Sequence, residues 1–377
     1  MKKVLTARPI IPELASYQLC VKDILESGFL TNEGPYLKAF EEELSEYLGQ
    51  ENLLLVSSAT TGLMLALKSF DLPAAATIAT STYSFPATSQ AIKFIGFTPL
   101  FFDVQEDCNI SLTDLANGLN TDPSIDAIMP VECYGNPLDL LEIRKLLPTS
   151  EIPIILDSAH TFGPSWRNRS LKENEIAVLS LHATKGMNSI EGGVIICGSK
   201  EKKDALVKAR NFGYTDTYEV EGFGINAKMS ELHASFGLLA LKACDDAIKT
   251  RYRNAKLLRA TLDNDVKILL NTNELTNNLY FPVKFTSQRL RDQVHRCLTA
   301  RGIFSRCYFN PLLHTIYRET NHLEFPKAAN LASTVLCLPI HHDIDETDLM
   351  TVANLINGEI IKAREELSPF QKRNTHV

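Results

Sequence analysis

Several familiar sequence signals are missing from this chain of 377 residues. Basic residues are not in excess, because the formal net charge is −7, and this argues against nucleic-acid binding, which needs a concentrated basic surface. No two of the eight cysteines have C-x-x-C spacing, so neither a zinc cluster nor a thioredoxin-like dithiol is indicated. No apolar run approaches the roughly 20 residues that span a bilayer, and the N-terminus lacks the run of a signal peptide. We therefore expect a soluble cytoplasmic protein with reduced cysteines and no membrane or nucleic-acid partner.

The chain is rich enough in apolar residues to build a large core, since 45% of its residues are hydrophobic and 22% are charged. Strand signals alternate with helix signals through the first half of the chain. We expect strands at residues 53–56, 77–81, 99–103, 127–131 and 152–157, and helices at residues 14–27, 35–48, 63–70, 85–95, 112–119 and 139–146. This alternation predicts an α/β fold with a mainly parallel sheet covered by helices on both faces.

The pattern changes near residue 246, where a long helical signal (246–262) and a short strand signal (279–285) follow. We therefore predict a large domain over residues 1–245, including an N-terminal arm, and a small α+β domain over residues 246–377. The last stretch, 364–377, is polar, and we expect it to fray.

Ligands of parallel sheets bind at the carboxyl ends of the strands, and small polar residues follow three of these strands. The first cluster is the Ser-Ser-Ala-Thr-Thr-Gly run at 57–62, which comes between a strand and a helix. A helix N-terminus with hydroxyl side chains can bind a phosphate group. The same residue types are also preferred as plain helix caps, so both interpretations stay open at this point.

The other two clusters contain Asp157 and Lys185. Asp157 ends an apolar strand and is followed by two small residues and His160. Its carboxylate needs a partner, which could be a protonated ring nitrogen of a cofactor or an ordinary salt bridge. Lys185 follows the strand signal at 177–179 and precedes Glu191 and a Gly-Gly pair. A desolvated lysine becomes nucleophilic, whereas a lysine on a surface loop would have no such role.

The order of a phosphate turn, a strand-end aspartate and a lysine is typical of fold-type I pyridoxal-phosphate enzymes. The chain resembles one branch of them, the DegT/DnrJ/EryC1/StrS sugar aminotransferases, over nearly its whole length. The likeness is strongest in the Asp-Ser-Ala-His-Thr-Phe-Gly and Ser-Leu-His-Ala-Thr-Lys stretches and in the Glu-Gly-Gly stretch that follows them. All the stretches that carry it are 29–35, 47–49, 58–60, 83–88, 134–137, 157–163, 180–185, 191–193, 211–214 and 224–231.

The resemblance implies a large domain with a seven-stranded sheet, the cofactor pyridoxal 5′-phosphate, and particular residue roles. Lys185 would form the Schiff base, Asp157 would pair with the ring nitrogen, and His160 would lie beside the ring. Phe85 would cover the ring face, while Ala59, Thr60 and Ser180 would bind the phosphate. Asn226 would reach the cofactor of a neighbouring subunit, which implies a homodimer with shared active sites. The expected substrate-binding residues are Glu191, His314, Tyr214 and Lys228.

Two positions separate this chain from parts of that family. Ala59 stands where many members have glycine, and some relatives share the alanine. Lys185 is present, whereas dehydratase relatives carry histidine there, so transamination is favoured over dehydration. Two other protein classes fit less well. The intact Lys185, Asp157 and His160 argue against a catalytically dead regulator, and the absence of G-x-G-x-x-G after the first strand argues against a dehydrogenase.

The resemblance also implies the substrates, which are L-glutamate and a nucleotide-linked keto sugar. The Ser-Leu-His-Ala-Thr-Lys version of the lysine stretch is closest to members that aminate C4. We therefore expect dTDP-4-keto-6-deoxy-D-glucose to be converted to dTDP-4-amino-4,6-dideoxy-D-glucose, for O-antigen or another glycan. UDP-linked 4-keto sugars and 3-keto-6-deoxy sugars remain alternatives.

Overall fold

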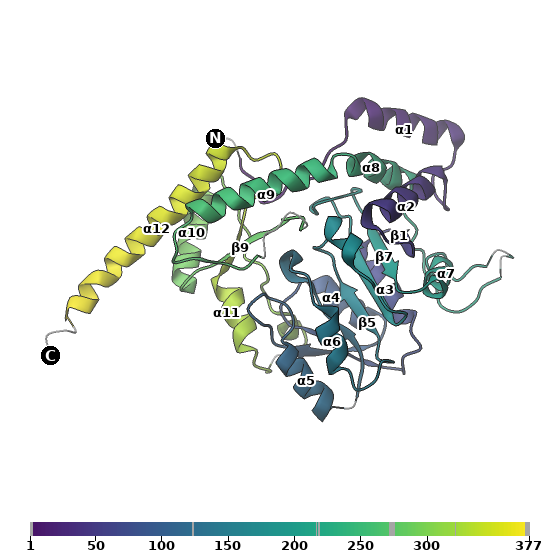
Figure 1. The fold of residues 1–377 in the computed structure, drawn as a ribbon, viewed down its shortest axis with the longest axis horizontal. Helices are drawn as coiled ribbons and strands as arrows, with labels where there is room; N and C mark the ends of the chain where they lie inside the picture. Colours follow the sequence, from purple (N-terminus) through teal and green to yellow (C-terminus); the bar gives the residue numbers. More distant parts are fainter. Residues whose placement is uncertain are drawn as a thin grey trace.

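A seven-stranded sheet forms the centre of the larger part of the molecule (Figure 1). The computed structural model describes residues 3–122, 124–215, 217, 219–270, 276–320 and 322–373. The strand order is β1-β7-β6-β5-β4-β2-β3. In chain order these strands are β1 (Leu53–Val56), β2 (Thr77–Ser81), β3 (Thr98–Phe102), β4 (Ile125–Met129), β5 (Ile154–Asp157), β6 (Glu175–Ser180) and β7 (Gly193–Cys197).

The sheet is mainly parallel, as the sequence predicts. Strands β3, β2, β4, β5 and β6 pair in parallel, and β7 runs antiparallel to both of its neighbours, β6 and β1. Parallel neighbours need a long crossover, whereas antiparallel neighbours can be joined by a loop without a helix. The segment 181–192 between β6 and β7 is such a loop, and it contains Lys185.

Helices cover both faces of this sheet, so most of its strand residues are buried. Along β1, Leu53 and Leu55 point to one face and Leu54 and Val56 to the other, and all four are buried. The helices of this part are α1 (Leu14–Ser27), α2 (Pro35–Leu48), α3 (Ala59–Lys68), α4 (Pro86–Phe94), α5 (Leu112–Thr121), α6 (Leu140–Leu146), α7 (Lys200–Ala209) and α8 (Glu231–Leu241), with the 3-10 helices η1 (Cys133–Gly135) and η2 (Pro164–Asn168).

Helix α3 begins four residues earlier than the apolar pattern suggests. We expected a turn at 57–62 and a helix from residue 63, but α3 starts at Ala59. The hydroxyl of Ser58 accepts a hydrogen bond from the Thr61 N–H, and the Thr61 hydroxyl accepts one from the Ser58 N–H. This capping box stabilises the first turn, so the small polar residues belong to the helix itself.

The C-terminal part contains a second, three-stranded antiparallel sheet in the order β10-β9-β8. Its apolar core also takes in Val4 from the N-terminal arm, whose backbone pairs with Ile303. The elements of this part are α9 (Cys244–Thr261), β8 (Lys267–Ile268), β9 (Phe281–Lys284), α10 (Gln288–Ala300), η3 (Leu313–Ile316), α11 (Pro326–Thr334), β10 (Val335–Leu338) and α12 (Glu346–Arg373).

Helix α9 runs between the two parts (Figure 1). Its first residues, including Cys244 and Ile248, belong to the core of the large sheet, and its later residues Ala255 and Leu258 belong to the C-terminal core. The predicted domain boundary after residue 245 therefore falls near the start of this helix, and the division at that residue stays a prediction.

The polar end of the chain belongs to helix α12 up to Arg373. The expected fraying from residue 364 stays a prediction, and residues 374–377 lie outside the described part. The guanidinium of Arg364 is bonded to Asp263 and Asp265, which ties this turn of the helix to the segment after α9. Figure 1 shows α12 extending away from the body of the molecule.

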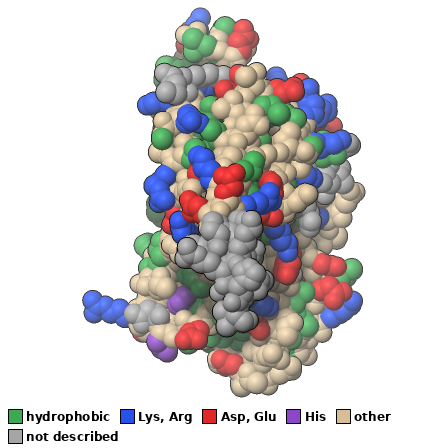
Figure 2. All heavy atoms as spheres, turned by 90° about the vertical axis from the view of Figure 1, so that its left-hand side faces the viewer, with side chains coloured by type: hydrophobic (Ala, Val, Ile, Leu, Met, Phe, Trp, Pro, Cys, Tyr) green, Lys and Arg blue, Asp and Glu red, His purple; other side chains and the backbone are tan. Residues whose placement is uncertain are grey.

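Positive and negative side chains are interspersed over the face of the molecule seen in Figure 2, which fits the moderately acidic composition. None of the helices in the described ranges combines the length and the apolar character that a membrane span requires. All eight cysteines lie in the described part as free thiols.

Candidate active site

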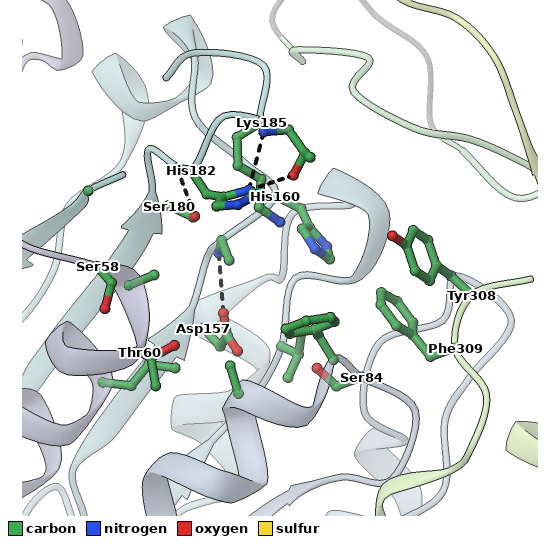
Figure 3. Close-up of a pocket in the computed structure, with 18 of the residues that line it drawn as sticks. Ser58, Thr60, Ser84, Asp157, His160, Ser180, His182, Lys185, Tyr308 and Phe309 are labelled. Carbon is green, nitrogen blue, oxygen red and sulfur yellow. Dashed lines mark hydrogen bonds between the residues drawn. The ribbon is translucent and has the colours of Figure 1, made fainter. Parts of the chain in front are cut away.

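One cavity of about 290 Å³ brings together most of the residues that the sequence singled out. It lies where β5, β6 and the N-terminus of α3 meet, beside the loop between β6 and β7 (Figure 3). This position agrees with the rule that parallel sheets bind ligands at the carboxyl ends of their strands. The predicted site residues that line it are Ala59, Thr60, Phe85, Asp157, His160, Ser180, Lys185 and Glu191.

The N-terminus of α3 forms one wall of the cavity. Its first-turn N–H groups at Ala59 and Thr60 have no partner within the helix, because such groups lack a carbonyl four residues earlier in the helix. The hydroxyls of Thr60 and Ser180 line the same cavity. Ser58 and Thr61 cap the helix through their own hydroxyls. Capping and anion binding are therefore divided between neighbouring residues, so both interpretations of this turn can hold together.

Gly193 lets α3 approach the sheet this closely. A Cβ atom at Gly193 would lie 2.7 Å from the backbone nitrogen of Ala59 and 2.8 Å from the carbonyl carbon of Ser58. Both contacts are with backbone atoms, which cannot rotate away as a flexible side chain could. Because glycine has no Cβ, a Gly-Gly pair permits a close backbone approach, and Gly193 meets the first turn of α3 in this way.

Asp157 ends β5 and is buried, with only 5% of its surface exposed. Its Oδ2 accepts a 2.6 Å hydrogen bond from the Thr88 hydroxyl, and its Oδ1 accepts one of 3.3 Å from the Ala159 N–H. Burial raises the pKa of Asp157, while the hydrogen bonds and the nearby Lys185 oppose that rise. Within the described part of the chain, no cation forms a salt bridge with this carboxylate.

Lys185 lies on the loop between β6 and β7, with its Nζ 5.9 Å from the centre of the Tyr280 ring. Removal from water lowers the pKa of Lys185 from 10.5 to about 8, and the charge of Asp157 limits this fall. A larger fraction of the side chain is therefore the neutral, nucleophilic amine at slightly basic pH than for an ordinary lysine. The alternative of an ordinary surface-loop lysine does not fit this environment.

His160 is packed between rings from the C-terminal part. Its imidazole stacks on Phe309, with an angle of 4° between the ring planes. It also packs edge-to-face with Tyr280, with 4.8 Å between the ring centres. Burial, followed by the charge of Lys185, holds the pKa of His160 well below its usual value, so the ring is neutral. Its Nδ1 is buried without a hydrogen-bond partner among the described residues, which leaves this atom available to a ligand.

The cavity includes residues that the sequence did not single out. Tyr280, Tyr308 and Phe309 come from the C-terminal part and line the cavity. Tyr308 and Phe309 lie on the right of Figure 3. His182 also lines the cavity, and its Nε2 lies 3.4 Å from Oε1 of Glu191. The three aromatic residues are more than 90 positions after Lys185 in the chain, so no local pattern could have placed them here.

Four predicted site residues do not line this cavity. His314 is buried elsewhere, with its Nδ1 2.7 Å from the Thr82 hydroxyl and its ring against Phe325. Tyr214 and Lys228 lie together in another surface depression, and Asn226 is exposed on the strand-like segment that pairs with Asn211. Their roles toward a sugar nucleotide or a second subunit stay predictions.

The residues of the cavity fit pyridoxal phosphate. An anion site at the N-terminus of α3, a buried carboxylate at Asp157 and a partly neutral amine at Lys185 match the phosphate, ring nitrogen and aldehyde of that cofactor. His160, whose Nδ1 has no hydrogen-bond partner among the described residues, lines the same cavity. Phe85, with 54% of its surface exposed, offers a ring face at the cavity that a flat ligand could cover.

Comparisons with known proteins agree with this fit. The model of the DegT/DnrJ/EryC1/StrS aminotransferase family matches residues 15–357. Two curated relatives are each named dTDP-4-amino-4,6-dideoxy-D-glucose transaminase. The one from Escherichia coli is 33% identical and aligns over 95% of this chain and 99% of its own length, and the one from Shigella dysenteriae is 32% identical over 94% and 98%.

A crystal structure of DesI in the presence of its TDP-sugar product has the same fold. It is 28% identical to this chain, with a TM-score of 0.86, and the match covers 97% of this chain and 96% of that one. The predicted fold class and cofactor are thereby confirmed. The chain belongs to the DegT/DnrJ/EryC1/StrS aminotransferase family and is a pyridoxal-phosphate-dependent aminotransferase.

Proposed function

We propose that this aminotransferase moves the amino group of L-glutamate to dTDP-4-keto-6-deoxy-D-glucose and so forms dTDP-4-amino-4,6-dideoxy-D-glucose. The observation that carries the proposal is the grouping of Lys185, Asp157 and the N-terminus of α3 around one cavity. This grouping occurs in a chain that is 33% identical, over nearly its full length, to a transaminase named for that product. The amino sugar would serve O-antigen or other glycan synthesis, and the enzyme would work in the cytoplasm.

Bound pyridoxal phosphate supplies an electron sink that stabilises negative charge at the carbon that loses a proton. Lys185 would hold the cofactor through its Nζ. The same Nζ would be the base that takes the proton from the α-carbon of glutamate. A pKa of about 8 suits this work, because a general base is most effective when its pKa lies near the working pH. In the second half of the reaction the amine delivers a proton to the sugar carbon that receives nitrogen.

The other residues of the cavity would hold the cofactor and orient it. Asp157 keeps the ring nitrogen of the cofactor protonated, and the Thr88 hydroxyl helps to keep Asp157 in its anionic form. The N–H groups of Ala59 and Thr60 and the hydroxyl of Ser180 hold the phosphate. His160 stays neutral, because burial disfavours its protonated form, and it would lie beside the cofactor ring. Phe85, an exposed side chain that lines the cavity, would cover the face of that ring.

The two half-reactions use one cavity in turn, so glutamate and the keto sugar react in a ping-pong sequence. We propose that the working form is a homodimer in which Asn226 of one subunit completes the cofactor site of the other. Its exposure, and its position outside the cavity of its own chain, support this arrangement. Glu191 lies at the edge of the cavity, where it can meet the sugar substrate.

The test is a substrate panel offered to the purified enzyme with L-glutamate. The panel contains dTDP- and UDP-linked 4-keto-6-deoxy sugars and a dTDP-linked 3-keto-6-deoxy sugar, and products are identified by mass spectrometry and NMR. We expect the dTDP-4-keto sugar to give the highest kcat/KM and a product aminated at C4. A higher kcat/KM for the UDP-linked or 3-keto sugar would change the assigned substrate. Failure to aminate any of the sugars would overturn the sugar assignment while leaving the aminotransferase family intact.

A further inference from the structure

A buried ion pair lies next to the turn that carries Asp157 and His160. Glu132 follows β4 and has 0% of its surface exposed. Arg169 follows η2 and contacts both carboxylate oxygens of Glu132, with its Nη1 2.9 Å from Oε2 and its Nη2 bonded to Oε1. The guanidinium also lies on the face of the Trp166 ring, 4.3 Å from its centre. Neither Glu132 nor Arg169 lines the cavity of Lys185.

Glu132 holds the neighbouring turn at several points. Its Oε2 accepts hydrogen bonds from the hydroxyls of Ser158 (2.7 Å) and Thr161 (3.0 Å). Its backbone N–H donates to the carbonyl of Asp157 at 3.0 Å. These bonds fall on three of the five residues 157–161, and the turn between them presents Asp157 and His160 to the cavity. The carboxylate of Glu132 therefore holds the turn on both sides of His160, and its backbone N–H holds it at Asp157.

The charge of Glu132 is kept despite its burial. Burial by itself would raise the pKa of Glu132, but the guanidinium of Arg169 and the surrounding hydrogen bonds leave the pKa below its usual value. An ionised carboxylate can only accept hydrogen bonds, so the Ser158 hydroxyl donates to it. The Thr161 hydroxyl has one hydrogen, which it shares between Glu132 and the Ser158 carbonyl. A buried ion pair often adds little net stability compared with apolar residues of the same size. Stability alone therefore does not explain a pair at this place.

We propose that Glu132 and Arg169 are positioning residues that fix the turn of residues 157–161 from outside the cavity, so that Asp157 and His160 meet the cofactor in one geometry. The inference rests on the roles proposed above for Asp157 and His160. Arg169 keeps Glu132 ionised, and Glu132 orients the turn through Ser158 and Thr161. Displacement of a reactive group by about 1 Å can lower a rate about 100-fold, so a clamp at this distance from the chemistry has a measurable effect.

The chain offers a matched control pair. Arg144 and Glu175 also form an ion pair with two hydrogen bonds, at 2.6 Å and 2.5 Å, and the Glu175 side chain is 4% exposed. Glu175 is the first residue of β6, whereas Ser180 at the cavity is its last. This control pair matches the Glu132–Arg169 pair in chemistry and burial. It lies at the opposite end of β6 from Ser180, and neither of its residues lines the cavity.

The experiment compares Glu132→Gln with Glu175→Gln in the pyridoxal-phosphate-bound enzyme. We expect Glu132→Gln to lower kcat by about 10- to 100-fold, to weaken cofactor affinity, and to speed hydrogen exchange at the amides of residues 157–161. Glu175→Gln should lower the unfolding midpoint to a similar extent and change kcat and cofactor affinity less than about two-fold. If Glu132→Gln does not fold, Thr161→Val keeps the ion pair and should still lower kcat about three- to ten-fold.

Asp157→Asn separates this inference from the proposed function. If Asp157→Asn keeps normal cofactor affinity and turnover, the proposed role of Asp157 fails. Alternatively, Asp157→Asn loses cofactor affinity and turnover while Glu132→Gln behaves like Glu175→Gln in kcat, in cofactor affinity and in hydrogen exchange at residues 157–161. That combination overturns only the positioning inference. When Glu132→Gln yields no folded protein, normal kcat and normal exchange in Thr161→Val overturn it in the same way.

Discussion

The hydroxyl of Thr88 lies 2.6 Å from Oδ2 of Asp157 and 2.8 Å from the hydroxyl of Ser84. Because an ionised carboxylate can only accept, the Thr88 O–H must donate to Asp157, and the Ser84 O–H must donate to Thr88. This two-step relay supplies a donor to a carboxylate that burial would otherwise drive toward its neutral form. Asp157 therefore depends on helix α4 for the charge it presents to the cofactor.

Thr88→Val tests this relay, because valine keeps the shape of threonine and removes the donor. A hydrogen bond to a charged group contributes about 1.5–3 kcal/mol, so we expect the dissociation constant of pyridoxal phosphate to rise about ten-fold or more. The pKa of Asp157 should rise further. As the pH is lowered, the variant should therefore lose cofactor affinity at a higher pH than the wild type does. Cofactor titrations over a range of pH measure both effects. Ser84→Ala should have a smaller effect, and an equal effect of the two variants would contradict the relay.

Lys185→Met should make the cofactor-free protein more stable at neutral pH while it abolishes turnover. The pKa of Lys185 is lowered to about 8, so below pH 8 its charged form is kept in the fold and lowers the free energy of unfolding. Between pH 8 and 10.5 the unfolded chain still binds this proton and the folded chain does not, so the wild type gains stability as the pH rises. The gain from methionine, up to about 3 kcal/mol at pH 7, should therefore shrink toward pH 10. Urea unfolding at both pH values checks this, and a pH-independent gain would refute it.

Gly193→Ala should weaken the phosphate end of the site. The added Cβ would press on the backbone of Ser58 and Ala59, so the first turn of α3 must shift away from the cavity. Overpacking of this kind costs about 1–3 kcal/mol, and we expect a similar loss in the free energy of unfolding together with weaker cofactor binding. Gly358→Ala, in helix α12 with open space around it, is the control and should leave cofactor affinity unchanged. Unchanged affinity in Gly193→Ala would show that this close approach is not needed.

Asn226 allows a direct test of shared active sites. A Lys185→Ala chain and an Asn226→Ala chain should each have little activity alone. If each site combines Lys185 of one subunit with Asn226 of the other, a mixed dimer contains one intact site. Random reassociation of equal amounts should then restore about a quarter of wild-type activity, because half of the dimers are mixed. Activity no higher than the average of the two separate variants would mean that each site uses residues of a single chain.

The sequence by itself determined the class of the fold and the approximate positions of its strands. The apolar run 53–56 coincides with β1 and the expected strand 77–81 with β2, whereas the expected strands at 99–103, 127–131 and 152–157 differ from β3, β4 and β5 by one or two residues at an end. A strand buried on both faces, such as β1, leaves a local, continuous signal. It also placed Asp157 at the end of a strand and Ala59 and Lys185 in segments that follow strands, and strand ends of a parallel sheet meet at one edge. Their convergence on one cavity could therefore be foreseen from the chain.

Only the tertiary structure decided what surrounds these residues. Tyr280 and Phe309 reach the cavity from a different part of the chain, and Glu132 and Arg169 meet beneath the Asp157 turn although 36 residues separate them. Contacts of this kind depend on how helices and sheets pack, and no local periodicity encodes them. The pKa of Lys185 is likewise set by the tertiary structure. The sequence specifies the amine, while burial beside Asp157 determines how readily that amine loses its proton.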